Sequence, residues 1–570
     1  MSRTLAIAIC GSGGAGVVAC GELLLRGWAR AGGLGFLRKA FGPQIRGGES
    51  AALLCLGEDE TYLPTAAMDL LVALDWNQFA RFEDEIALGP QSTVLCPDDD
   101  EVPASVQASG ATVVALPLAA AVAGAHPEGR RNMFALGLLG QLLGLDAAAL
   151  AALATARLAG KAPAYRDAAA ACIDAGAGWP LAVAVTPPAR PGGERWLLTG
   201  NQAAGYGALE AGVRFVAAYP ITPASDVLEY LAGALEAVGG QLVQAEDELA
   251  AVNMALGAAF GGADAFTATS GPGLALMTES LGLAVASETP LTVLNVMRGG
   301  PSTGIPTKSE QGDLDIALHG LHGDAPHLVL AALDIADCAF TTSWAVALAR
   351  QLQTPALVLS DQFLGQSLAI VSPPGLHVAL PAAAVETVDA GEYLRYRLTA
   401  SGVSALALPG DPGRRFTADG LEHSERGTPS TAARDHAAQL DKRARKLATL
   451  GPGPHWGTVD GEGELALVTF GSASAAARAA ATRLRAAGTA CRVVCLRLLA
   501  PLPAAALEEA LAGCRRVLVV EQNHSAQCWR HLRAHLGDVP VPAESFARPG
   551  PAPLDPAAIA AMLAEEPVHG

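Results

Sequence analysis

The sequence predicts three α/β domains, each a doubly wound sheet with helices on both faces. Short apolar runs of strand length alternate with segments of helix length, and glycine-rich turns stand between several of these runs and the helices that follow. The length of 570 residues also exceeds what one hydrophobic core supports. This organisation indicates a multidomain enzyme rather than a single binding module.

The first domain is expected over residues 1–185, with a largely parallel sheet. A helix is expected where "GVVACGELLLRGWARAG" follows the first apolar run. Residues 186–195 contain three prolines and two glycines and are expected to be a linker. The strands of this domain are predicted at residues 4–10, 50–57, 68–75, 92–98 and 111–117.

The second domain is expected over residues 196–375 and the third over 461–570. Residues 376–460 form a less regular connecting segment that ends in the charged, helix-forming "DHAAQLDKRARKLATL". Strands of the second domain are predicted at 213–220, 263–270, 291–298 and 354–361. Those of the third domain are predicted at 464–471, 491–499 and 516–523, with a helix at 474–488.

Composition excludes several classes of protein. The formal net charge of −18 disfavours binding to nucleic-acid phosphates and to membrane surfaces. No apolar stretch of membrane-spanning length and no export signal is present, so a soluble cytoplasmic protein is expected. Ten cysteines occur without a CxxC pair, which argues against an iron–sulfur cluster or structural zinc held by this chain alone.

The opening "GSGGAGVVACG", residues 11–21, resembles a dinucleotide phosphate cradle, because it joins an apolar strand to a helix. A dinucleotide-dependent dehydrogenase would need an acidic residue about 20 residues later to hold the ribose. Residues 30–48 are instead basic and contain no Asp or Glu. The glycine turn therefore predicts an anion site, or a purely structural turn, rather than a nicotinamide site.

A second strand-to-helix turn lies in "AAYPITPASDVLEYL", residues 217–231. Prolines 220 and 223 flank Thr222, whose hydroxyl would face the carboxyl edge of a parallel sheet, where ligands of α/β proteins usually bind. A proline-stiffened turn without a ligand is the alternative.

Acidic and basic candidates follow. Glu246, Asp247 and Glu248 stand between a strand and a helix, where acids commonly only complement the helix dipole. "TSGPG", residues 269–273, suits close backbone approach. Arg298 ends a strand before a run rich in Gly, Ser, Thr and Pro, and its guanidinium suits a bidentate clamp on a carboxylate, with a surface salt bridge as the alternative.

Five motifs in this order resemble the α subunit of 2-oxoacid:ferredoxin oxidoreductases, especially the 2-oxoglutarate type. They are "YPITP", "QAEDELAAVNMALGAAFGGA", "TSGPG", "RGGPSTGIPTKSEQGDL" and "GLEHSERGTPSTAARDHAAQLDKRARKL". "GSGGAGVV" and "FGPQIRGGES" resemble the γ subunit of the same enzymes, and "VVEQNHSAQCWRHLR" resembles a transketolase C-terminal-like domain. The resemblance implies a fused γ–α subunit with three Rossmann-like or transketolase-like domains.

These enzymes use thiamine diphosphate, iron–sulfur clusters and coenzyme A to convert a 2-oxo acid into an acyl-CoA. The resemblance therefore implies oxidation of 2-oxoglutarate to succinyl-CoA, with CO2 released and two electrons passed on. Glu246 would be the catalytic carboxyl at N1′ of the aminopyrimidine, and Thr222 and Arg298 would hold the substrate carboxylate. Lys308 would meet a distal carboxylate, with a solvated lysine as the alternative. Thiamine diphosphate would contact Pro220, Ile221, Thr269 and Ser270.

A partner subunit is also implied, because no GDG motif for the diphosphate and Mg²⁺ occurs in the chain. A β subunit would carry that site and a 4Fe–4S cluster in an (αβ)2 assembly, and no metal site is expected in this chain. Electrons would pass to ferredoxin or to a flavin-containing subunit. Coenzyme A would be held by the glycine turn and by a basic side chain, namely Gly11, Gly13, Gly14, Gly16 and Arg46.

Two alternatives remain open within this reading. In the first, the substrate is a different 2-oxo acid, either branched-chain or aryl, such as phenylglyoxylate. In the second, the chain is a noncatalytic assembly subunit, although the match at Thr222, Glu246 and Arg298 argues against this alternative.

Overall fold

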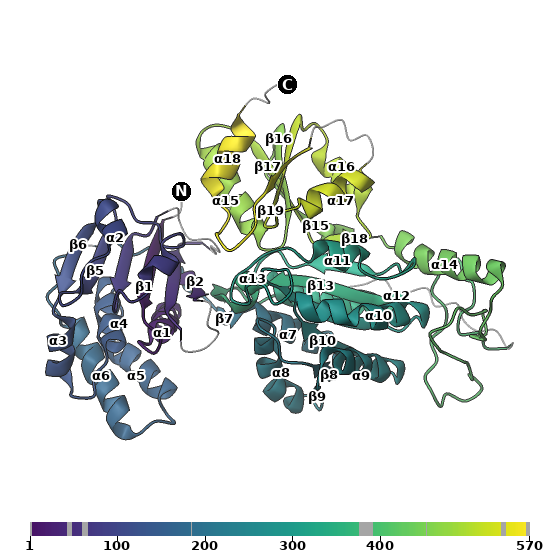
Figure 1. Cartoon of the computed structure of the whole chain (residues 1–570), viewed down its shortest axis with the longest axis horizontal. Coiled ribbons are helices and arrows are strands. Elements are labelled where there is room, and N and C mark those ends of the chain that lie inside the picture. Colours follow the sequence, from purple (N-terminus) through teal and green to yellow (C-terminus); the bar gives the residue numbers. More distant parts are fainter. Residues whose placement is uncertain are drawn as a thin grey trace. The chain divides into compact units, whose positions relative to one another are not determined.

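The computed structural model describes residues 3–42, 48–59, 67–183, 185–375, 392–451, 453–536 and 543–565 (Figure 1). The chain divides into two compact units. Unit 1 comprises Met1–Thr199, Pro306–Lys308 and Gln366–Pro373, and unit 2 comprises Gly200–Ile305, Ser309–Gly365 and Pro374–Gly570. Both units are built from mixed sheets and helices, so the predicted α/β class is confirmed.

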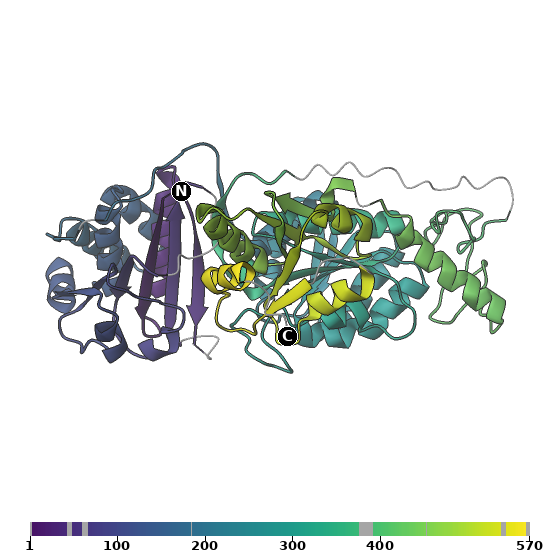
Figure 2. The same ribbon diagram turned by 90° about the horizontal axis from the view of Figure 1, so that it is seen from above.

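Unit 1 contains an eight-stranded sheet of order β6-β5-β4-β1-β3-β2-β14-β7, whose long strands lie side by side in purple in Figure 2. The strands are β1 (Thr4–Gly11), β2 (Leu34–Phe41), β3 (Ser50–Gly57), β4 (Leu70–Ala73), β5 (Thr93–Pro97), β6 (Thr112–Leu116), β7 (Trp196–Thr199) and β14 (Leu368–Val371). The helices are α1 (Val17–Arg30), α2 (Ala104–Ala108), α3 (Leu118–Ala125), α4 (Arg131–Leu142), α5 (Ala147–Arg157) and α6 (Pro163–Ala177).

The prediction of a largely parallel first sheet is correct for only half of it. β1, β4, β5 and β6 are parallel, whereas β3, β2, β14 and β7 pair with their neighbours in antiparallel fashion. The chain between Phe41 and Ser50 is too short for the crossover that a parallel pair requires, and it therefore joins β2 to β3 as an antiparallel pair.

The core of unit 1 lies on both faces of this sheet. Successive residues of a strand point to opposite faces, and along β1 the residues Leu5, Ile7 and Ile9 enter one apolar cluster. Ala6, Ala8 and Cys10 enter the other. This double burial explains why the first strand is an uninterrupted apolar run.

The predicted boundary at residue 196 differs from the structure. β7 and β14 fall within the expected second domain, yet both belong to the sheet of unit 1. β14 pairs with the open edge of β2 and so satisfies backbone groups that would otherwise be unpaired. Residues 186–195, all described, lie in neither helix nor strand.

Unit 2 contains a seven-stranded sheet of order β18-β12-β13-β11-β10-β8-β9, parallel except for β18. The strands are β8 (Phe215–Ala218), β9 (Gln241–Gln244), β10 (Ala265–Thr269), β11 (Leu291–Met297), β12 (Leu328–Ala331), β13 (Pro355–Asp361) and β18 (Leu498–Ala500). The helices are α7 (Gly200–Glu210), α8 (Ser225–Ala237), α9 (Glu248–Phe260), α10 (Gly271–Ala286), α11 (Leu314–His319), α12 (Asp337–Leu352) and α13 (Gln362–Gln366).

A five-stranded sheet of order β15-β17-β16-β19-β20 completes unit 2, with α15 and α18 on one side and α16 and α17 on the other (Figure 1). Its strands are β15 (Gly457–Asp460), β16 (Leu465–Phe470), β17 (Cys491–Leu496), β19 (Arg516–Glu521) and β20 (Ala543–Ala547). Its helices are α15 (Ala473–Ala486), α16 (Ala504–Leu511), α17 (Gln527–His535) and α18 (Pro556–Ala564).

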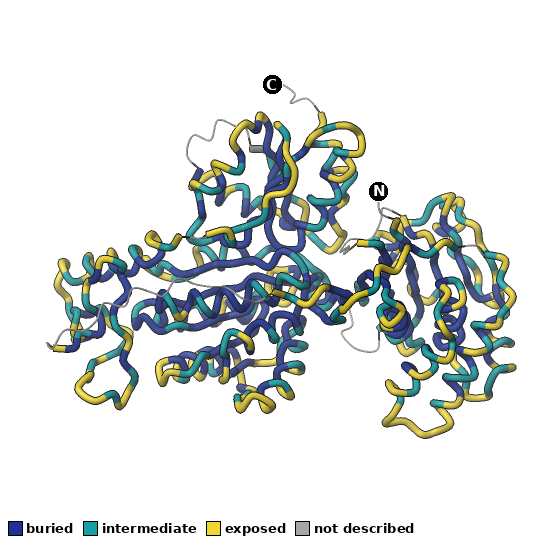
Figure 3. Tube along the Cα trace, turned by 180° about the vertical axis from the view of Figure 1, so that it is seen from behind, coloured by how far each residue is buried: buried dark blue, intermediate teal, exposed yellow. Residues whose placement is uncertain are grey.

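The predicted third domain is not separate from the second. β18, which follows β17 in the chain, pairs with β12 of the seven-stranded sheet. One apolar cluster contains residues of both sheets, and Figure 3 shows their strands as buried segments. The two sheets therefore share a core.

Most of the connecting segment is described, but residues 376–391 lie outside the described residues. The helix predicted near its end is α14 (Ala433–Ala448). Although this helix is strongly charged, Lys442 and Lys446 are buried, each ion-paired with Glu288.

Candidate functional site

The strand ends that the motifs occupy meet at one edge of the seven-stranded sheet. β10 pairs in parallel with both β8 and β11, so the carboxyl ends of these three strands lie together. Thr222 follows β8, Thr269 ends β10, and Arg298 follows β11. The candidate site is therefore built from segments distant in sequence, within unit 2.

The structure brings Arg298 and Thr222 into direct contact. The Arg298 side chain is buried, and its Nη1 donates a hydrogen bond of 2.5 Å to the carbonyl oxygen of Thr222. Its Nε is buried without a hydrogen-bond partner among the described residues. The surface salt bridge considered for Arg298 is therefore wrong, and the guanidinium retains donors for a further acceptor.

Asp313 is a neighbour of Arg298 that the sequence reasoning missed. Asn295, on β11, donates from Nδ2 to Asp313 Oδ2 at 3.0 Å. Burial raises the pKa of the Asp313 carboxyl, which the hydrogen bond from Asn295 and the charge of Arg298 partly oppose. Burial lowers the pKa of Arg298, and Asp313 opposes that shift. The two side chains thus stabilise each other's charged forms.

The two glycines of "TSGPG" lie so close to neighbouring side chains that no Cβ fits at either position. A Cβ at Gly271 would lie 2.6 Å from Asp313 Oδ1, and one at Gly273 would lie 2.7 Å from Glu248 Oε1. Only a residue without a side chain leaves these carboxylates in place. The turn that the sequence marked for close backbone approach is therefore approached by two acidic side chains.

The three acids of "QAEDE" differ in their surroundings. Glu246, the predicted catalytic carboxyl, is exposed. Asp247 is the N-cap of α9 and accepts the N–H of Ala250 at 2.7 Å, so the helix-terminus role belongs to this residue. Glu248 begins the helix, is buried, and lies against Gly273 of the "TSGPG" turn. Burial and contact thus favour Glu248 over Glu246 as the carboxyl of the site.

The remaining predicted cofactor contacts surround the same edge. Pro220 is exposed and Ile221 is partly buried, whereas Thr269 and Ser270 are fully buried. Ser270 Oγ and Asn295 Oδ1 are buried without hydrogen-bond partners in the described part of the chain. Buried polar atoms are normally paired, so these atoms indicate a place where a polar ligand supplies the missing bonds.

Lys308 belongs to unit 1, where its Nζ bonds Glu85 and lies 5.9 Å from the ring centroid of Phe82. Its side chain is largely buried, so the solvated-lysine alternative is wrong. Its positive charge already has a carboxylate partner. A role toward a substrate carboxylate stays a prediction.

The opening glycines form the turn between β1 and α1. Gly14 and Gly16 have φ of 84° and 81°, a region that favours glycine. Two basic residues of the segment that follows this turn already have acidic partners within the chain. Arg38 pairs with Glu85 at 3.0 Å, and Lys39 pairs with Glu22 at 2.8 Å. Arg46 lies outside the described residues.

All ten cysteines are buried and free. Among the described residues, no three His, Cys, Asp or Glu side chains are grouped to hold a metal ion. Within the same residues, no helix combines the length and apolarity needed to cross a bilayer.

A buried arginine, acidic side chains and unpaired polar atoms at the carboxyl edge of a parallel sheet define a ligand-binding α/β enzyme. Three family descriptions match successive parts of the chain: "Pyruvate ferredoxin/flavodoxin oxidoreductase" (residues 6–179), the thiamine diphosphate-binding "Pyruvate flavodoxin/ferredoxin oxidoreductase, thiamine diP-bdg" (206–442) and "Pyruvate:ferredoxin oxidoreductase core domain II" (463–556). Together with the relatives described next, they show that the chain belongs to the 2-oxoacid:ferredoxin oxidoreductase family, which confirms the resemblance of its motifs.

Its relatives include 2-oxoglutarate enzymes. The chain is 36% identical over 330 residues to 2-oxoglutarate synthase subunit KorA of Archaeoglobus fulgidus, covering 58% of this chain and 88% of the relative. It is 35% identical over 432 residues to 2-oxoglutarate oxidoreductase subunit KorA of Mycobacterium tuberculosis, covering 72% and 65%. The solved 2-oxoglutarate:ferredoxin oxidoreductase from Magnetococcus marinus, with 2-oxoglutarate, coenzyme A and succinyl-CoA bound, matches with a TM-score of 0.89, 32% identity and 99% coverage of both chains.

The residues at the sheet edge fit thiamine diphosphate in chemical terms. An aminopyrimidine carries both donors and acceptors, and the edge supplies a buried carboxyl in Glu248 and an unpaired hydroxyl in Ser270. The glycines 271 and 273 keep the adjoining turn free of side chains.

Proposed function

We propose that this chain is the γ–α subunit of a thiamine-diphosphate-dependent 2-oxo acid:acceptor oxidoreductase. It takes part in the coenzyme A-dependent oxidative decarboxylation of 2-oxoglutarate to succinyl-CoA. The observation that carries the proposal is the buried Arg298, bonded to the Thr222 carbonyl at the sheet edge that also holds Glu248. The names of the relatives and the ligands of the Magnetococcus marinus structure support the choice of substrate.

Arg298 binds and orients the substrate carboxylate in this proposal. One edge of the guanidinium is fixed by the Thr222 carbonyl, and the buried Nε has no partner among the described residues. Because the side chain is buried, few water molecules compete for its donors. The Thr222 hydroxyl adds a donor beside it, and Asp313 helps to keep the guanidinium in place.

Thiamine diphosphate, when bound, supplies the electron sink that decarboxylation of a 2-oxo acid requires. The carboxyl of the "QAEDE" segment holds the proton at N1′ of the aminopyrimidine. Glu246 has this role by its motif position, but it is exposed and depends on a partner subunit to exclude water from it. Glu248 is already enclosed, and the geometry therefore favours Glu248. Pro220, Ile221, Thr269 and Ser270 form the surrounding wall.

The remaining components come from partners. A β subunit carries the diphosphate and Mg²⁺ site and a 4Fe–4S cluster, in an (αβ)2 assembly, and passes electrons to ferredoxin or to a flavin-containing subunit. The relatives are themselves named as subunits, which supports a multi-subunit enzyme. Coenzyme A is held in part by the turn that contains Gly11, Gly13, Gly14 and Gly16 and by Arg46. A branched-chain or aryl 2-oxo acid is the second candidate substrate.

The proposal is tested with the chain co-purified with its natural partners. Dye reduction dependent on coenzyme A is measured across a panel of 2-oxo acids for the wild type, Glu246→Gln and Glu248→Gln. Each variant removes one charge with little change of volume, so each is the matched control for the other. Glu248→Gln is expected to lower kcat by about 100-fold or more while Glu246→Gln retains most activity.

The reverse result would return the catalytic role to Glu246. Full activity of both variants would refute a carboxyl of this segment at N1′. If the wild-type complex retains thiamine diphosphate but oxidises no 2-oxo acid in the panel, the proposed reaction is wrong. If it retains none on co-purification, the noncatalytic alternative is favoured.

A further inference from the structure

Gln311 lies two residues before Asp313, and its hydrogen bonds connect it to the five-stranded sheet. The residue is fully buried. Its backbone N–H donates to the carbonyl oxygen of Gln522 at 2.7 Å, and its Oε1 accepts the N–H of Gln522 at 2.8 Å. Its Nε2 donates to the carbonyl oxygen of Phe470 at 2.8 Å. Phe470 ends β16 and Gln522 follows β19, so the segment that contains Asp313 is fixed to these two strand ends.

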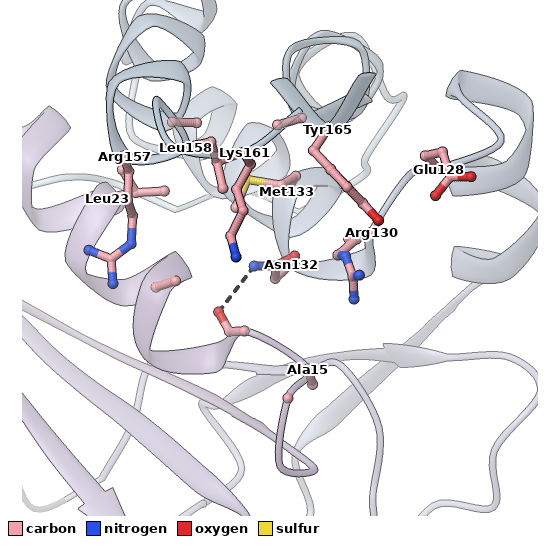
Figure 4. A pocket seen from close by; sticks show the side chains of 15 residues that line it. Ala15, Leu23, Glu128, Arg130, Asn132, Met133, Arg157, Leu158, Lys161 and Tyr165 are labelled. Carbon is pink, nitrogen blue, oxygen red and sulfur yellow. Dashed lines mark hydrogen bonds between the residues drawn. The ribbon is translucent and has the colours of Figure 1, made fainter. Parts of the chain in front are cut away.

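The side-chain amide of Gln311 is paired at both ends, which is not true of every buried amide in this protein. Asn132, in the wall of a cavity of about 390 Å³ in unit 1, donates from Nδ2 to the carbonyl oxygen of Gly16 at 3.2 Å (Figure 4). Its Oδ1 has no hydrogen-bond partner among the described residues. Gln311 is also closely enclosed, because a Cβ at Gly471 would lie 2.4 Å from its Nε2. Displacing a fully paired buried amide leaves several groups unsatisfied, so Gln311 is a fixed point of the fold.

A second amide holds the backbone on both sides of Asp313. Gln527, the first residue of α17, donates from Nε2 to the carbonyl oxygen of Gly312 at 2.9 Å. Its Oε1 accepts the N–H of Asp315 at 2.8 Å. Gly312 directly precedes Asp313, and Asp315 follows it by two positions. The backbone of Asp313 is therefore held between two hydrogen bonds of one side chain.

Glu521 holds this arrangement together from the end of β19. Its side chain is fully buried. The carboxylate accepts the N–H groups of Cys528 at 2.7 Å and Trp529 at 3.0 Å, and the Nδ2 of Asn523 at 2.6 Å. These bonds connect β19 to the first turn of α17, where Gln527 lies. The motif "VVEQNHSAQCWRHLR" thus forms a rigid support for the segment around Asp313.

The supported residue, Asp313, faces the sheet edge that carries Arg298. Although Asp313 is the N-cap residue of α11, its side chain does not cap that helix. The carboxylate instead accepts the Nδ2 of Asn295 at 3.0 Å, and its charge acts on Arg298. A Cβ at Gly271 would lie 2.6 Å from Asp313 Oδ1. The carboxylate therefore lies between β11 and the "TSGPG" turn, within the candidate site.

We propose that Gln311 and Gln527 are positioning residues for binding of the 2-oxo acid. They hold Asp313 where its charge keeps the Arg298 guanidinium oriented, with its free donors directed at the substrate carboxylate. The five-stranded sheet thereby sets the affinity of a site that is built on the seven-stranded sheet. The inference rests on the proposed function, because it requires Arg298 to bind the substrate carboxylate.

The test is steady-state dye reduction by the chain co-purified with its partners. Gln311→Met and Gln527→Met each remove the hydrogen bonds of one amide without changing the charge or the length of the side chain. Each variant is expected to raise the KM for 2-oxoglutarate by about tenfold while kcat stays within about twofold, because substrate binding is weakened and the reacting groups are untouched. The KM for coenzyme A and the content of bound thiamine diphosphate are expected to stay unchanged.

Gln439→Met is the matched control. Gln439 is also buried in unit 2, and its Nε2 donates to the carbonyl oxygen of Tyr396 at 3.2 Å. It lies on α14, and none of its described hydrogen bonds reaches residues 311–315. The control should leave the KM for 2-oxoglutarate unchanged even where it lowers Tm. Thermal unfolding of every variant separates a loss of stability from a change in substrate affinity.

Asp313→Asn tests whether Gln311 acts through Asp313. Asparagine still accepts a hydrogen bond from Asn295 but carries no charge, so adding Gln311→Met to Asp313→Asn should change the KM by less than about twofold. A tenfold effect of Gln311→Met in both backgrounds overturns the action through Asp313. If Gln311→Met does not assemble with its partners, Gln527→Met provides the same comparison, because it leaves the bonds of Gln311 in place.

The failure of this inference differs from the failure of the proposed function. An active complex in which both methionine variants keep the wild-type KM for 2-oxoglutarate overturns the positioning role and leaves the proposed function standing. A fall in kcat with an unchanged KM also overturns the positioning role. A wild-type complex that oxidises no 2-oxo acid refutes the proposed function, and the positioning role with it.

Discussion

Replacing Glu288 by glutamine is predicted to destabilise unit 2 strongly. The carboxylate accepts hydrogen bonds from Lys442 Nζ at 2.5 and 2.6 Å and is paired with Lys446 Nζ at 2.7 Å. Arg395 lies 3.8 Å away. All four side chains are 2% exposed or less. Glutamine keeps the size of the side chain but leaves three buried cations without their anion.

The pKa values show how strongly these groups interact. Burial by itself raises the pKa of Glu288, yet Lys446, Lys442 and Arg395 together lower it to about 2. Burial lowers the pKa of Lys446 to about 7, although Glu288 opposes this shift. Removing one partner of a buried ion pair costs about 3–5 kcal/mol. At about 2–4 °C per kcal/mol for a cooperative unit of moderate size, Tm should fall by about 6–20 °C.

The pH dependence gives a second measure of the same interaction. Without Glu288 the folded-state pKa of Lys446 falls further below its value in the unfolded chain. The unfolded state then binds more protons, so the stability of the variant rises with pH through the neutral and alkaline range. Because the pKa of Lys446 is about 7 in the wild type, its contribution to the difference in Tm between wild type and variant should shrink as pH rises toward 7 and change little above it.

The assay is thermal unfolding followed by circular dichroism, with Glu279→Gln as the control. Glu279 is an exposed residue of α10, and its replacement removes the same charge. The control should unfold at the wild-type temperature. A Glu288→Gln protein that also unfolds within about 2 °C of the wild type would refute the buried cluster as a stabilising element.

Two further predictions concern substrate binding and acid stability. A lysine cannot form the two parallel hydrogen bonds that a guanidinium makes to a carboxylate. Arg298→Lys should therefore lower kcat/KM for the 2-oxo acid by about 100-fold without loss of bound thiamine diphosphate. An unchanged kcat/KM would contradict the role of Arg298 in binding the substrate carboxylate. Burial lowers the pKa of His531 to about 4, so the unfolded state binds more protons between that pH and the ordinary pKa of about 6.5. The free energy of unfolding should fall by up to about 1.4 kcal/mol per pH unit as pH decreases through this interval. Denaturant titrations of His531→Gln should show a weaker dependence of this free energy on pH than the wild type. The same pH dependence in both proteins would refute the lowered pKa of His531.

Local sequence patterns were sufficient for the elements and for part of the site. The apolar run at residues 291–298 predicts both β11 and the position of Arg298 at its end, because strand formation depends on neighbouring residues. The prolines around Thr222 mark the turn after β8 in the same way. Parallel pairing of β8, β10 and β11 then places Thr222 and Arg298 together.

Local patterns could not predict which strands pair with one another when they are distant in sequence. The apolar residues of β14 satisfy the rules for a buried strand in any sheet, and only the open edge of β2 decides that it joins unit 1. The same holds for β18 and β12. The sequence likewise gives no sign that Lys308 has an acidic partner. Only the folded chain pairs it with Glu85, which is 223 positions away.

The sequence by itself determined the fold class, the family and the segments that form the site, because strand periodicity, turn chemistry and motif order are local properties. The tertiary structure decided which carboxyl of "QAEDE" is enclosed, since Asp247 caps α9 and thereby leaves Glu246 outside and Glu248 against Gly273. It also decided that the glycine turn borders a cavity with an unpaired Asn132 Oδ1. Burial and hydrogen-bond satisfaction depend on contacts between residues that are distant in sequence, such as Asn132 and Gly16, and only the folded chain brings those residues together.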